Sequence, residues 1–367
     1  MVQVQEFTIA DLRKRLESGS WFEGDPIPLT RERALSHINN PRADDSDVAL
    51  LVAYDDEMVI AHLGILPDHV FVGEQGHKIG WLTAWWANPD RKYSGSGIML
   101  MMRALSRYKN GVGASGFSED AKAIYIATKC FKTIKELPGL SAFARFDLTH
   151  MLPKRLPPLA HFWPLLQCAD AMANLFVRLR QYLWRRVNPL PVGFRLEYVP
   201  ELDAEAGQFI ERHPQNGLAR RGAREINWIA RYSWMTCTPL NSPPAFRFET
   251  TAQSRRSYHL MIRDASCRLV AVVLLHIIDN HLIIPCCCHD NQAALVARII
   301  GHHLIELRLK RITTFRTDLI EQFGQSRFPW VIQKQCARSW ILAGQAAVVG
   351  TKPVGVQDGD GDCAFTL

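Results

Sequence analysis

The sequence predicts an α/β fold made of two similar halves, each a mixed twisted sheet flanked by helices. Short apolar runs alternate with helix-forming stretches over residues 1–150, and the same order of elements returns over residues 192–367. The chain of 367 residues is also longer than one ordinary hydrophobic core needs. We therefore expect three parts: a first half over 1–150, a connecting segment over 151–191, and a second half over 192–367.

In the first half, the apolar pattern predicts two helices followed by a hairpin, whose strands are joined by Asp55-Asp56-Glu57. A strand rich in tryptophan then leads through a glycine-bearing loop into a helix, and a short strand, a further helix and a closing strand follow. The expected helices are 11–16, 31–38, 98–105 and 119–130, and the expected strands are 48–54, 58–66, 78–87, 111–118 and 143–148.

The second half predicts a strand, two helices, three apolar strands separated by turns, a long helix and one more strand. The expected ranges are 194–199, 203–212, 224–234, 257–263, 269–278, 281–288, 292–309 and 311–315. Between the halves, prolines bound an apolar stretch that ends in a basic aromatic run over 178–186, and Pro189 and Pro191 end that helix.

The composition is that of an ordinary globular protein, with 47% hydrophobic and 22% charged residues, which excludes a disordered or coiled-coil chain. A net charge of +7 suits an anionic small ligand, an acidic membrane face or nucleic acid, and identifies none of them. Nine cysteines without a Cys-x-x-Cys pair exclude a zinc ribbon and a disulfide framework, and favour a reducing compartment. Because the N-terminus lacks an apolar signal core, we expect a cytoplasmic protein.

The loop over residues 92–97 is the most informative stretch for function. It lies between a strand and a helix, where backbone N–H groups carry partial positive charge and glycines let an anion approach closely. The third glycine of a dinucleotide-binding loop is absent, and no Gly-Lys-Ser/Thr of a nucleoside triphosphate loop follows. The loop therefore predicts a phosphate cradle of another kind.

The stretch Ala87-Asn88-Pro89-Asp90-Arg91-Lys92-Tyr93-Ser94-Gly95-Ser96-Gly97-Ile98 resembles motif A of the GCN5-related N-acetyltransferase superfamily, with Lys92 at the position of an arginine or glutamine. The resemblance covers most of residues 1–150. It implies that backbone amides of Tyr93, Ser94, Gly95, Ser96, Gly97 and Ile98 hold the pyrophosphate of acetyl-CoA or another acyl-CoA. It also implies that the pantetheine runs along Trp85, Trp86 and Ala87.

Members of this superfamily often carry a tyrosine on the next helix that protonates the leaving thiolate. Here Ile126 occupies the matching position, and Tyr125 lies one residue earlier, so Tyr125 is a candidate acid or else a packed core aromatic. Glu119 and Asp120 are candidate bases, or acids that complement the helix dipole. His62, within an apolar strand, is a third candidate base or a core residue.

The corresponding loop of the second half, Pro285-Cys286-Cys287-Cys288-His289, has no glycine and no basic residue before the helix. We therefore expect this half not to bind CoA. Consecutive strand residues point to opposite faces, so the three cysteines are expected to pack rather than to bind a metal. The acidic run Asp358-Gly359-Asp360-Gly361-Asp362 lacks the spacing of a calcium loop, and we expect an acidic tail or turn there.

The basic aromatic helix within residues 159–186 allows two interpretations: a peripheral contact with the anionic inner face of a membrane, or an inter-domain helix with its apolar side packed. Basic residues near Arg220 and Arg255 do not form a recognised nucleic-acid module. No specific nucleic acid is therefore expected.

These patterns lead us to expect an acyl-CoA-dependent N-acyltransferase acting on a primary amine, such as an amino sugar or its nucleotide- or lipid-linked form. A Fem-like aminoacyl transferase and a non-catalytic CoA-binding protein remain as alternatives. The acceptor is expected to enter between the halves, and no metal is expected to take part.

Overall fold

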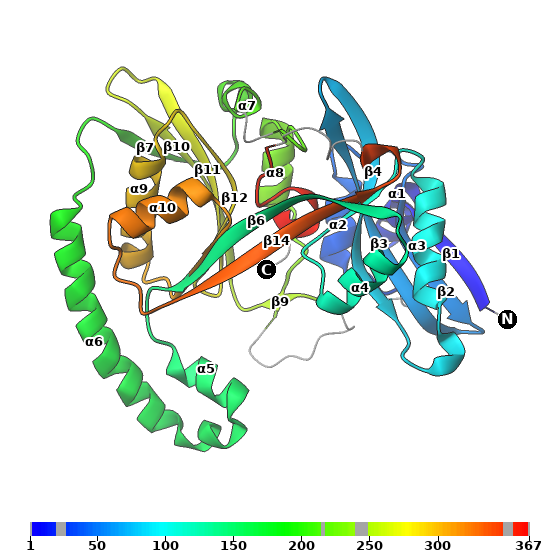
Figure 1. Ribbon diagram of the computed structural model, residues 1–367, viewed down its shortest axis with the longest axis horizontal. Coiled ribbons are helices and arrows are strands. Elements are labelled where there is room, and N and C mark those ends of the chain that lie inside the picture. The colour runs from blue at the N-terminus through cyan, green and yellow to red at the C-terminus, as the bar shows by residue number, and fades with distance from the viewer. Residues whose placement is uncertain (1, 20–26, 214–216, 239–248, 348–354, 366–367) are drawn as a thin grey trace.

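The computed structural model describes residues 2–19, 27–213, 217–238, 249–347 and 355–365, apart from the side chains of Arg91 and Lys154. Its main feature is one mixed sheet of twelve strands in the order β1-β2-β3-β4-β5-β14-β6-β13-β12-β11-β10-β7 (Figure 1). Helices cover both faces of the sheet. The predicted fold class, a mixed α/β fold with a twisted sheet, is confirmed.

The first half contributes β1 (Val2–Thr8), β2 (Val48–Asp55), β3 (Met58–Val72), β4 (Gln75–Ala87), β5 (Val112–Ser115) and β6 (Phe131–Phe143). The second half contributes β7 (Arg195–Val199), β10 (Arg255–Arg263), β11 (Leu269–Ile278), β12 (His281–His289), β13 (Arg311–Thr314) and β14 (Ile332–Ala343). Two short parallel strands, β8 (Thr236–Cys237) and β9 (Thr251–Ala252), form a separate small sheet.

The two halves exchange their long closing strands. The last strand, β14, pairs antiparallel with β5 on one side and with β6 on the other, and β6 pairs in turn with β13. Figure 1 shows β6 and β14 crossing the middle of the molecule side by side. Each half is therefore completed by a strand of the other half, and the domain limits expected near 150 and 192 stay a prediction.

The helices lie mostly where the sequence predicted them: α1 (Ile9–Glu17), α2 (Arg31–Ile38), α3 (Ser96–Arg107), α4 (Glu119–Ala127), α5 (Leu148–Arg155), α6 (Trp163–Val187), α7 (Ala204–Glu211), α8 (Ala223–Arg231), α9 (Ala293–Glu306) and α10 (Thr317–Gln325). Side chains at the N-caps explain several of the starts. Thr8 forms a capping box with Asp11, and Thr30 and Ser118 accept the amides of Arg33 and Ala121.

Two cores occupy the opposite faces of the sheet around β3, β4 and β5. On one face, Leu63, Leu82 and Ala114 pack against α3 and against Tyr125 of α4. On the other face, Trp81 lies in the core that also contains α7, α8 and the C-terminal residues. The alternation of side chains along β4 and β5 thus separates the two cores, as the period of a strand requires.

The prediction of a strand over residues 143–148 is wrong. The closing strand is β6, which ends at Phe143, and the chain then turns into α5. Pro138 and Gly139 within β6 and its charged first half obscure the strand pattern, because most of these side chains lie on the surface. The strand β14 is polar for the same reason and was not predicted.

The C-terminal segment over residues 356–365, which we call the tail, is buried throughout. It contains the short 3₁₀-helix η6 (Gly361–Ala364), and Phe365 stacks on Trp234 with a centroid distance of 4.6 Å. Arg338 forms an ion pair with Asp358, and the Trp340 indole N–H donates to the carbonyl oxygen of Asp360 at 2.9 Å. The expected acidic tail or turn is therefore part of the core.

Because β5 and β6 are joined only through β14, a fragment of residues 1–150 is expected not to fold alone. Mixing it with a fragment of residues 151–367 should restore the sheet. Near-ultraviolet circular dichroism and thermal melting of each fragment and of the mixture would test this. A cooperative unfolding transition of the 1–150 fragment by itself would contradict the strand exchange.

Replacing Phe365 by alanine removes an aromatic ring that stacks on Trp234 and meets Trp228 edge-on. We expect Phe365→Ala to lower the free energy of unfolding by about 3–5 kcal/mol, the usual cost of truncating a buried aromatic. Urea denaturation would measure it. The control Met102→Ala, at a half-exposed position, should change the free energy by less than about 0.5 kcal/mol.

Candidate functional site

The site is built around the point where β4 parts from β5. The two strands pair in parallel only from Gly80 to Leu82 of β4, and β4 continues to Ala87. A β-bulge follows that pairing: Ala84 has φ +48°, and the register with β3 shifts between His62 and Gly64. A bulge bends the strand and increases its twist, so the end of β4 turns away from β5.

The loop after β4 is fixed by its own hydrogen bonds. The amide of Asn88 donates to the Ile60 carbonyl oxygen at 2.8 Å, which ties the end of β4 to β3. Asp90 accepts the amide of Lys92 at its side chain and the amide of Tyr93 at its carbonyl oxygen. The loop is therefore rigid up to Tyr93, and the amides of Lys92 and Tyr93 are used within the protein.

The amides that follow have no such acceptor. Gly95 is the N-cap of α3 with φ +92° and no side-chain cap, and the first amide bonded to it is that of Met99, at 2.9 Å from the Gly95 carbonyl oxygen. In the described part of the chain, no acceptor is found for the amides of the five residues before Met99. These residues are Ser94, Gly95, Ser96, Gly97 and Ile98.

The two glycines of this loop have different physical roles. At Gly95 the positive φ excludes most side chains, and no atom lies within 4 Å of the position that a Cβ would take, so the backbone is open. At Gly97 a Cβ would lie 2.9 Å from the Trp85 Nε1 atom and 3.3 Å from the Ala87 Cβ atom. Gly97 therefore lets α3 start directly against the end of β4, where Trp85 donates to the Gly97 carbonyl oxygen at 3.1 Å.

The charge around these amides is suited to an anion. The first turn of α3 contains no acidic residue, so the positive end of the helix dipole is not neutralised there. The exposed ammonium of Lys92 lies 4.5 Å from the centre of the Tyr93 ring, at the edge of the same loop. A diphosphate would find free amide donors and a cation together.

Tyr125 lies on the same face of the sheet as α3. Its ring contacts Trp85 at 5.4 Å, Phe117 at 5.5 Å and Phe131 at 4.7 Å between ring centres, so the structure brings Tyr125 and Trp85 together. The ring is a packed aromatic, as one interpretation of the sequence held. Its hydroxyl, however, has no hydrogen-bond partner among the residues that the structure describes.

The tail reaches the same gap from the opposite face of the sheet. The Ser115 hydroxyl at the end of β5 donates to Asp362 Oδ1 at 2.6 Å, and the Thr83 hydroxyl on β4 also bonds to the Asp362 carboxylate. A Cβ on Gly361 would lie 2.4 Å from the Ser115 Oγ atom, so the tail passes this strand end in close contact. Asp362 therefore lies between β4 and β5 where they part.

The electrostatic environment links Asp362 to Tyr125 across the sheet. Burial, and after it the charge of Asp362, raises the pKa of the Tyr125 hydroxyl above its usual value. Burial likewise raises the pKa of the Asp362 carboxyl, and the hydrogen bonds from Ser115 and Thr83 and the charge of Arg33 oppose this rise. The site thus offers a protonated phenol on one side of the gap and a carboxyl with a raised pKa on the other.

Of the other predicted bases, two are exposed and one is buried. Glu119 and Asp120 are exposed in the first turn of α4, where Glu119 forms an ion pair with Lys122 at 3.7 Å. His62 is buried, its ring stacks on Trp86 at 5.6 Å, and burial lowers its pKa to about 4. The position of Glu119 and Asp120 fits acids that complement a helix dipole, and His62 is a neutral imidazole at pH 7.

Asp362 and its partners Ser115, Thr83 and Arg33 were missed from the sequence. The Arg33 guanidinium donates to the Thr83 hydroxyl at 3.1 Å and stacks over Trp234 at 3.9 Å, and burial lowers its pKa to about 10. One signal was available: an Asp-Gly repeat followed by small and apolar residues at a chain end is not the composition of a solvated acidic tail.

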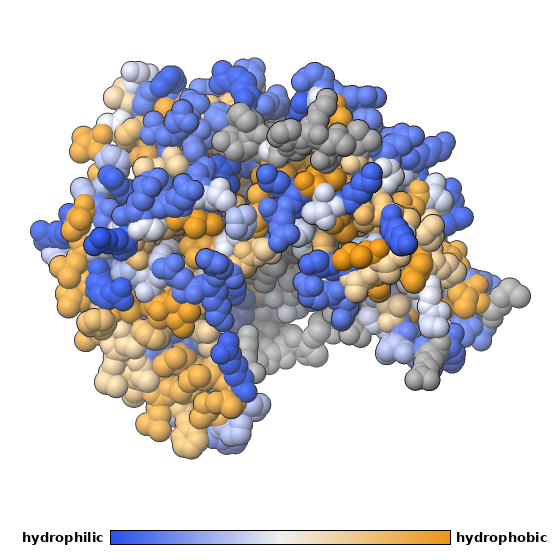
Figure 2. Space-filling model, in the orientation of Figure 1, coloured by the Kyte–Doolittle hydropathy of each residue, from blue (hydrophilic) through white to orange (hydrophobic). Residues whose placement is uncertain are grey.

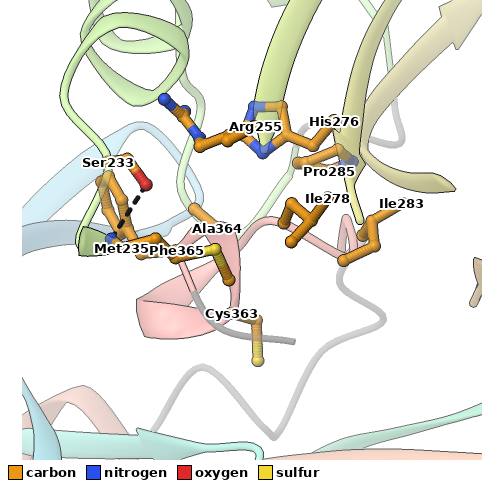
Figure 3. Close-up of a pocket in the computed structure, with 10 residues that line it drawn as sticks. All are labelled: Ser233, Met235, Arg255, His276, Ile278, Ile283, Pro285, Cys363, Ala364 and Phe365. Carbon is orange, nitrogen blue, oxygen red and sulfur yellow. Dashed lines mark hydrogen bonds between the residues drawn. The ribbon is translucent and has the colours of Figure 1, made fainter. Parts of the chain in front are cut away.

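A small cavity lies on the far side of the tail, between it and the second half (Figure 3). Cys363, Ala364 and Phe365 form one wall, and Arg255 and His276 contribute from β10 and β11. The cavity volume of about 10 Å³ is room for about one water molecule. The tail therefore packs closely against the second half on this face.

The equivalent position of the second half is closed by side chains. Gln357 of the tail accepts the amide of Cys287 at 2.9 Å, and Arg316 donates to the Cys287 carbonyl oxygen at 2.8 Å. The start of α9 is also occupied, because the amide of Gln292 donates to His289 at 3.2 Å. Cys286 and Cys288 lie in one core and Cys287 in the other, as their alternation predicted.

No family model matches this sequence, and no curated protein matches it. Among solved structures, the chain is similar to a conserved protein of unknown function from Enterococcus faecalis described as a probable N-acyltransferase, with 10% identity, a TM-score of 0.53, and coverage of 94% of this chain and 73% of that one. It is also similar to a GCN5-related N-acetyltransferase from Kribbella flavida, with 11% identity, a TM-score of 0.47, and coverage of 95% and 73%. A third is the Saccharomyces cerevisiae N-myristoyltransferase with bound myristoyl-CoA, with 8% identity, a TM-score of 0.48, and coverage of 94% and 79%.

At these low sequence identities, the comparison shows the fold alone. The Enterococcus faecalis structure matches nearly the whole chain, both halves included. The chain therefore shares the fold of that structure, which is described as a probable N-acyltransferase.

Proposed function

We propose that this protein is an acyl-CoA-dependent N-acyltransferase that transfers an acyl group to a primary amine. The observation that carries the proposal is the set of unpaired amides from Ser94 to Ile98, placed at the start of α3 beside the parted ends of β4 and β5. Acetyl is the simplest acyl group, and the acceptor class is an amino sugar or its nucleotide- or lipid-linked form.

The donor fits the residues at this site. The five unpaired amides and Lys92 would hold the pyrophosphate of CoA, since both supply positive charge without a competing carboxylate in the first helical turn. Trp85, Trp86 and Ala87 form the edge of β4 that β5 leaves unpaired, along which the pantetheine amides would run. Trp85 would then lie beside the thioester end of the donor, next to Tyr125.

The reaction needs one base and one acid, and the gap provides both. The amine nitrogen attacks the thioester carbonyl carbon, the C–N bond forms, and the C–S bond breaks to release CoA. Asp362 takes the proton that the attacking amine loses, and Tyr125 gives its proton to the leaving sulfur. The two groups approach from opposite faces of the sheet, so each can meet a different side of the reacting carbon.

The pKa shifts suit these roles. A raised pKa brings the Asp362 carboxyl closer to the working pH, where a carboxylate accepts a proton more readily than at its usual pKa. A raised pKa keeps the Tyr125 hydroxyl protonated until it is needed as a donor. In this proposal Asp362 takes the role of base first considered for Glu119, Asp120 and His62.

The proposal requires that CoA bind at the start of α3, and Gly97→Glu tests it. The new side chain would meet Trp85 and bring a negative charge to the diphosphate, so CoA affinity measured by isothermal titration calorimetry should fall at least 100-fold. Gly324→Glu in α10, where nothing lies within 4 Å of a Cβ, is the matched control and should bind like the wild type. Absence of CoA binding to the intact wild type would overturn the proposed function.

A second test concerns the base. Asp362→Asn keeps the shape of the side chain and should lower kcat/KM by about 100- to 10,000-fold in an assay of thiol release from acetyl-CoA with glucosamine as acceptor. Because the pKa of Asp362 is raised, the base form increases only as pH rises above the usual range of an aspartate. The wild-type rate should therefore increase with pH through that raised pKa, and the rate of the variant should not show this increase.

Asp45→Asn, at an exposed position distant in sequence from Asp362, is the control for that variant. Asp362→Asn should retain CoA affinity, which separates loss of the base from loss of the fold. A variant with the wild-type rate and pH profile would exclude Asp362 as the base.

A further inference from the structure

The helix α6 is held to the protein largely by hydrogen bonds and carries large apolar side chains on its outward side. The side that faces the protein is held by hydrogen bonds: Asp170 accepts the amides of Leu148 and Thr149, Asn174 bonds to the backbone of Phe146, and Gln181 donates to the Ala144 carbonyl oxygen at 2.8 Å. Farther along, the Trp184 indole N–H donates to the Ser326 carbonyl oxygen at 2.9 Å. Polar groups thus anchor the helix together with the buried Val177 and Trp184, whereas an ordinary surface helix turns mainly apolar residues inward.

The outward side of α6 is apolar. Six large side chains on it are more than half exposed: Leu165, Met172, Leu175, Phe176, Leu179 and Leu183. Their spacing of three, four and seven residues places them along one face of the helix. Figure 2 shows this face as a continuous orange region along the left and lower edge of the molecule, where Figure 1 places α6. An apolar area of this extent on a surface marks a binding face.

The charges around this face define what it binds. The segment 148–191 contains Lys154 and five arginines and a single acid, Asp170, which is used by the hydrogen bonds described above. Arg145 and Arg308 lie near Arg178 of α6, and burial, followed by the charges of the other two arginines, lowers the pKa of Arg145. The described residues provide no carboxylate partner for these three arginines, since Asp147 is paired with Lys310 and His150.

An open cavity of about 300 Å³ lies at the inner edge of α6, lined by Arg145, Arg308 and Lys310 together with Asp147 and Asp170. The basic side chains beside α6 therefore extend inward from the surface along this cavity. A partner for this surface must therefore offer a broad apolar layer bordered by anionic groups. A second copy of the chain does not, because two such faces would bring arginines against arginines with no free acid between them.

We propose that the outward face of α6 binds the surface of an anionic lipid bilayer, with α6 lying in the plane of the interface. The apolar side chains would enter the boundary between headgroups and acyl chains, and Arg145, Arg178 and Arg308 would contact the anionic headgroups. The described part of the chain contains no helix long and apolar enough to span a bilayer. Of the two interpretations of the connecting helix, this one accounts for the exposed face.

Co-sedimentation of the full-length protein with lipid vesicles tests the proposal. The wild type should bind vesicles of 70% phosphatidylcholine and 30% phosphatidylglycerol at least tenfold more tightly than vesicles of phosphatidylcholine alone, and added salt should weaken the difference. The triple variant Leu175→Ser, Leu179→Ser, Leu183→Ser should lose at least tenfold in binding to both kinds of vesicle. All three side chains are exposed, so its thermal unfolding should match that of the wild type.

Matched controls separate the helix from general surface effects. Met58→Ser, Met102→Ser, Ile332→Ser removes three exposed apolar groups elsewhere and should bind like the wild type. Arg178→Glu, Arg308→Glu should weaken binding to the anionic vesicles by about 25-fold or more and leave binding to neutral vesicles unchanged. The pair Arg231→Glu, Arg268→Glu, at exposed positions away from α6, should have little effect.

Three results would overturn the proposal. They are failure of the wild type to bind the anionic vesicles, equal binding by the serine variant of α6, and a wild-type dimer in light scattering that this variant converts to a monomer. The last result would assign the face to a second copy of the chain. None of these measurements depends on CoA binding or acyl transfer, so their outcome is independent of the proposed function.

Discussion

The parting of β4 from β5 is the constraint on which the candidate site depends. Parallel strands that stayed paired beyond Leu82 would use the amide and carbonyl groups at the end of β4. The bulge at Ala84 ends the pairing, and Gly97 then allows α3 to begin against the end of that strand. The unpaired amides at the start of α3, Tyr125 on one face and Asp362 on the other all reach the same gap for this reason.

The tail shows how strongly buried charge depends on long-range partners. Three aspartates within five residues would be unfavourable in a core without compensation, because burial removes the water that solvates a carboxylate. Asp358 pairs with Arg338 on β14. Arg221 forms an ion pair with Asp68 at 2.8 Å and also donates to the carbonyl oxygen of Gly359, which lies between Asp358 and Asp360. Arg338 thus partly compensates the charge of Asp358, and Arg221 and Arg338 hold the tail in place through its backbone carbonyl oxygens.

Much of the fold could be predicted because its strands are apolar where they are central. The hairpin of β2 and β3 and the strands β11 and β12 are nearly all buried, and apolar runs bounded by turns identify them. The glycine loop and the start of α3 could be predicted because strand, loop and helix are contiguous in the sequence. The exchanged strands and the position of Asp362 could not be predicted: β6 and β14 are polar along much of their length, and Asp362 meets Ser115 across 247 positions of sequence. Local patterns contain no information about partners at that separation.

The two halves of the fold differ at the end of one strand. In the first half, the space after the paired part of β4 and β5 remains available to amides and side chains of the site. In the second half, Gln357 and Arg316 hydrogen-bond the amide and the carbonyl of Cys287, and His289 accepts an amide at the start of α9. Backbone groups that are satisfied within the protein have nothing to offer a ligand. Gln357 and Asp362 belong to the same tail. This one segment therefore hydrogen-bonds a strand end in each half, at Cys287 in the second half and at Ser115 in the first.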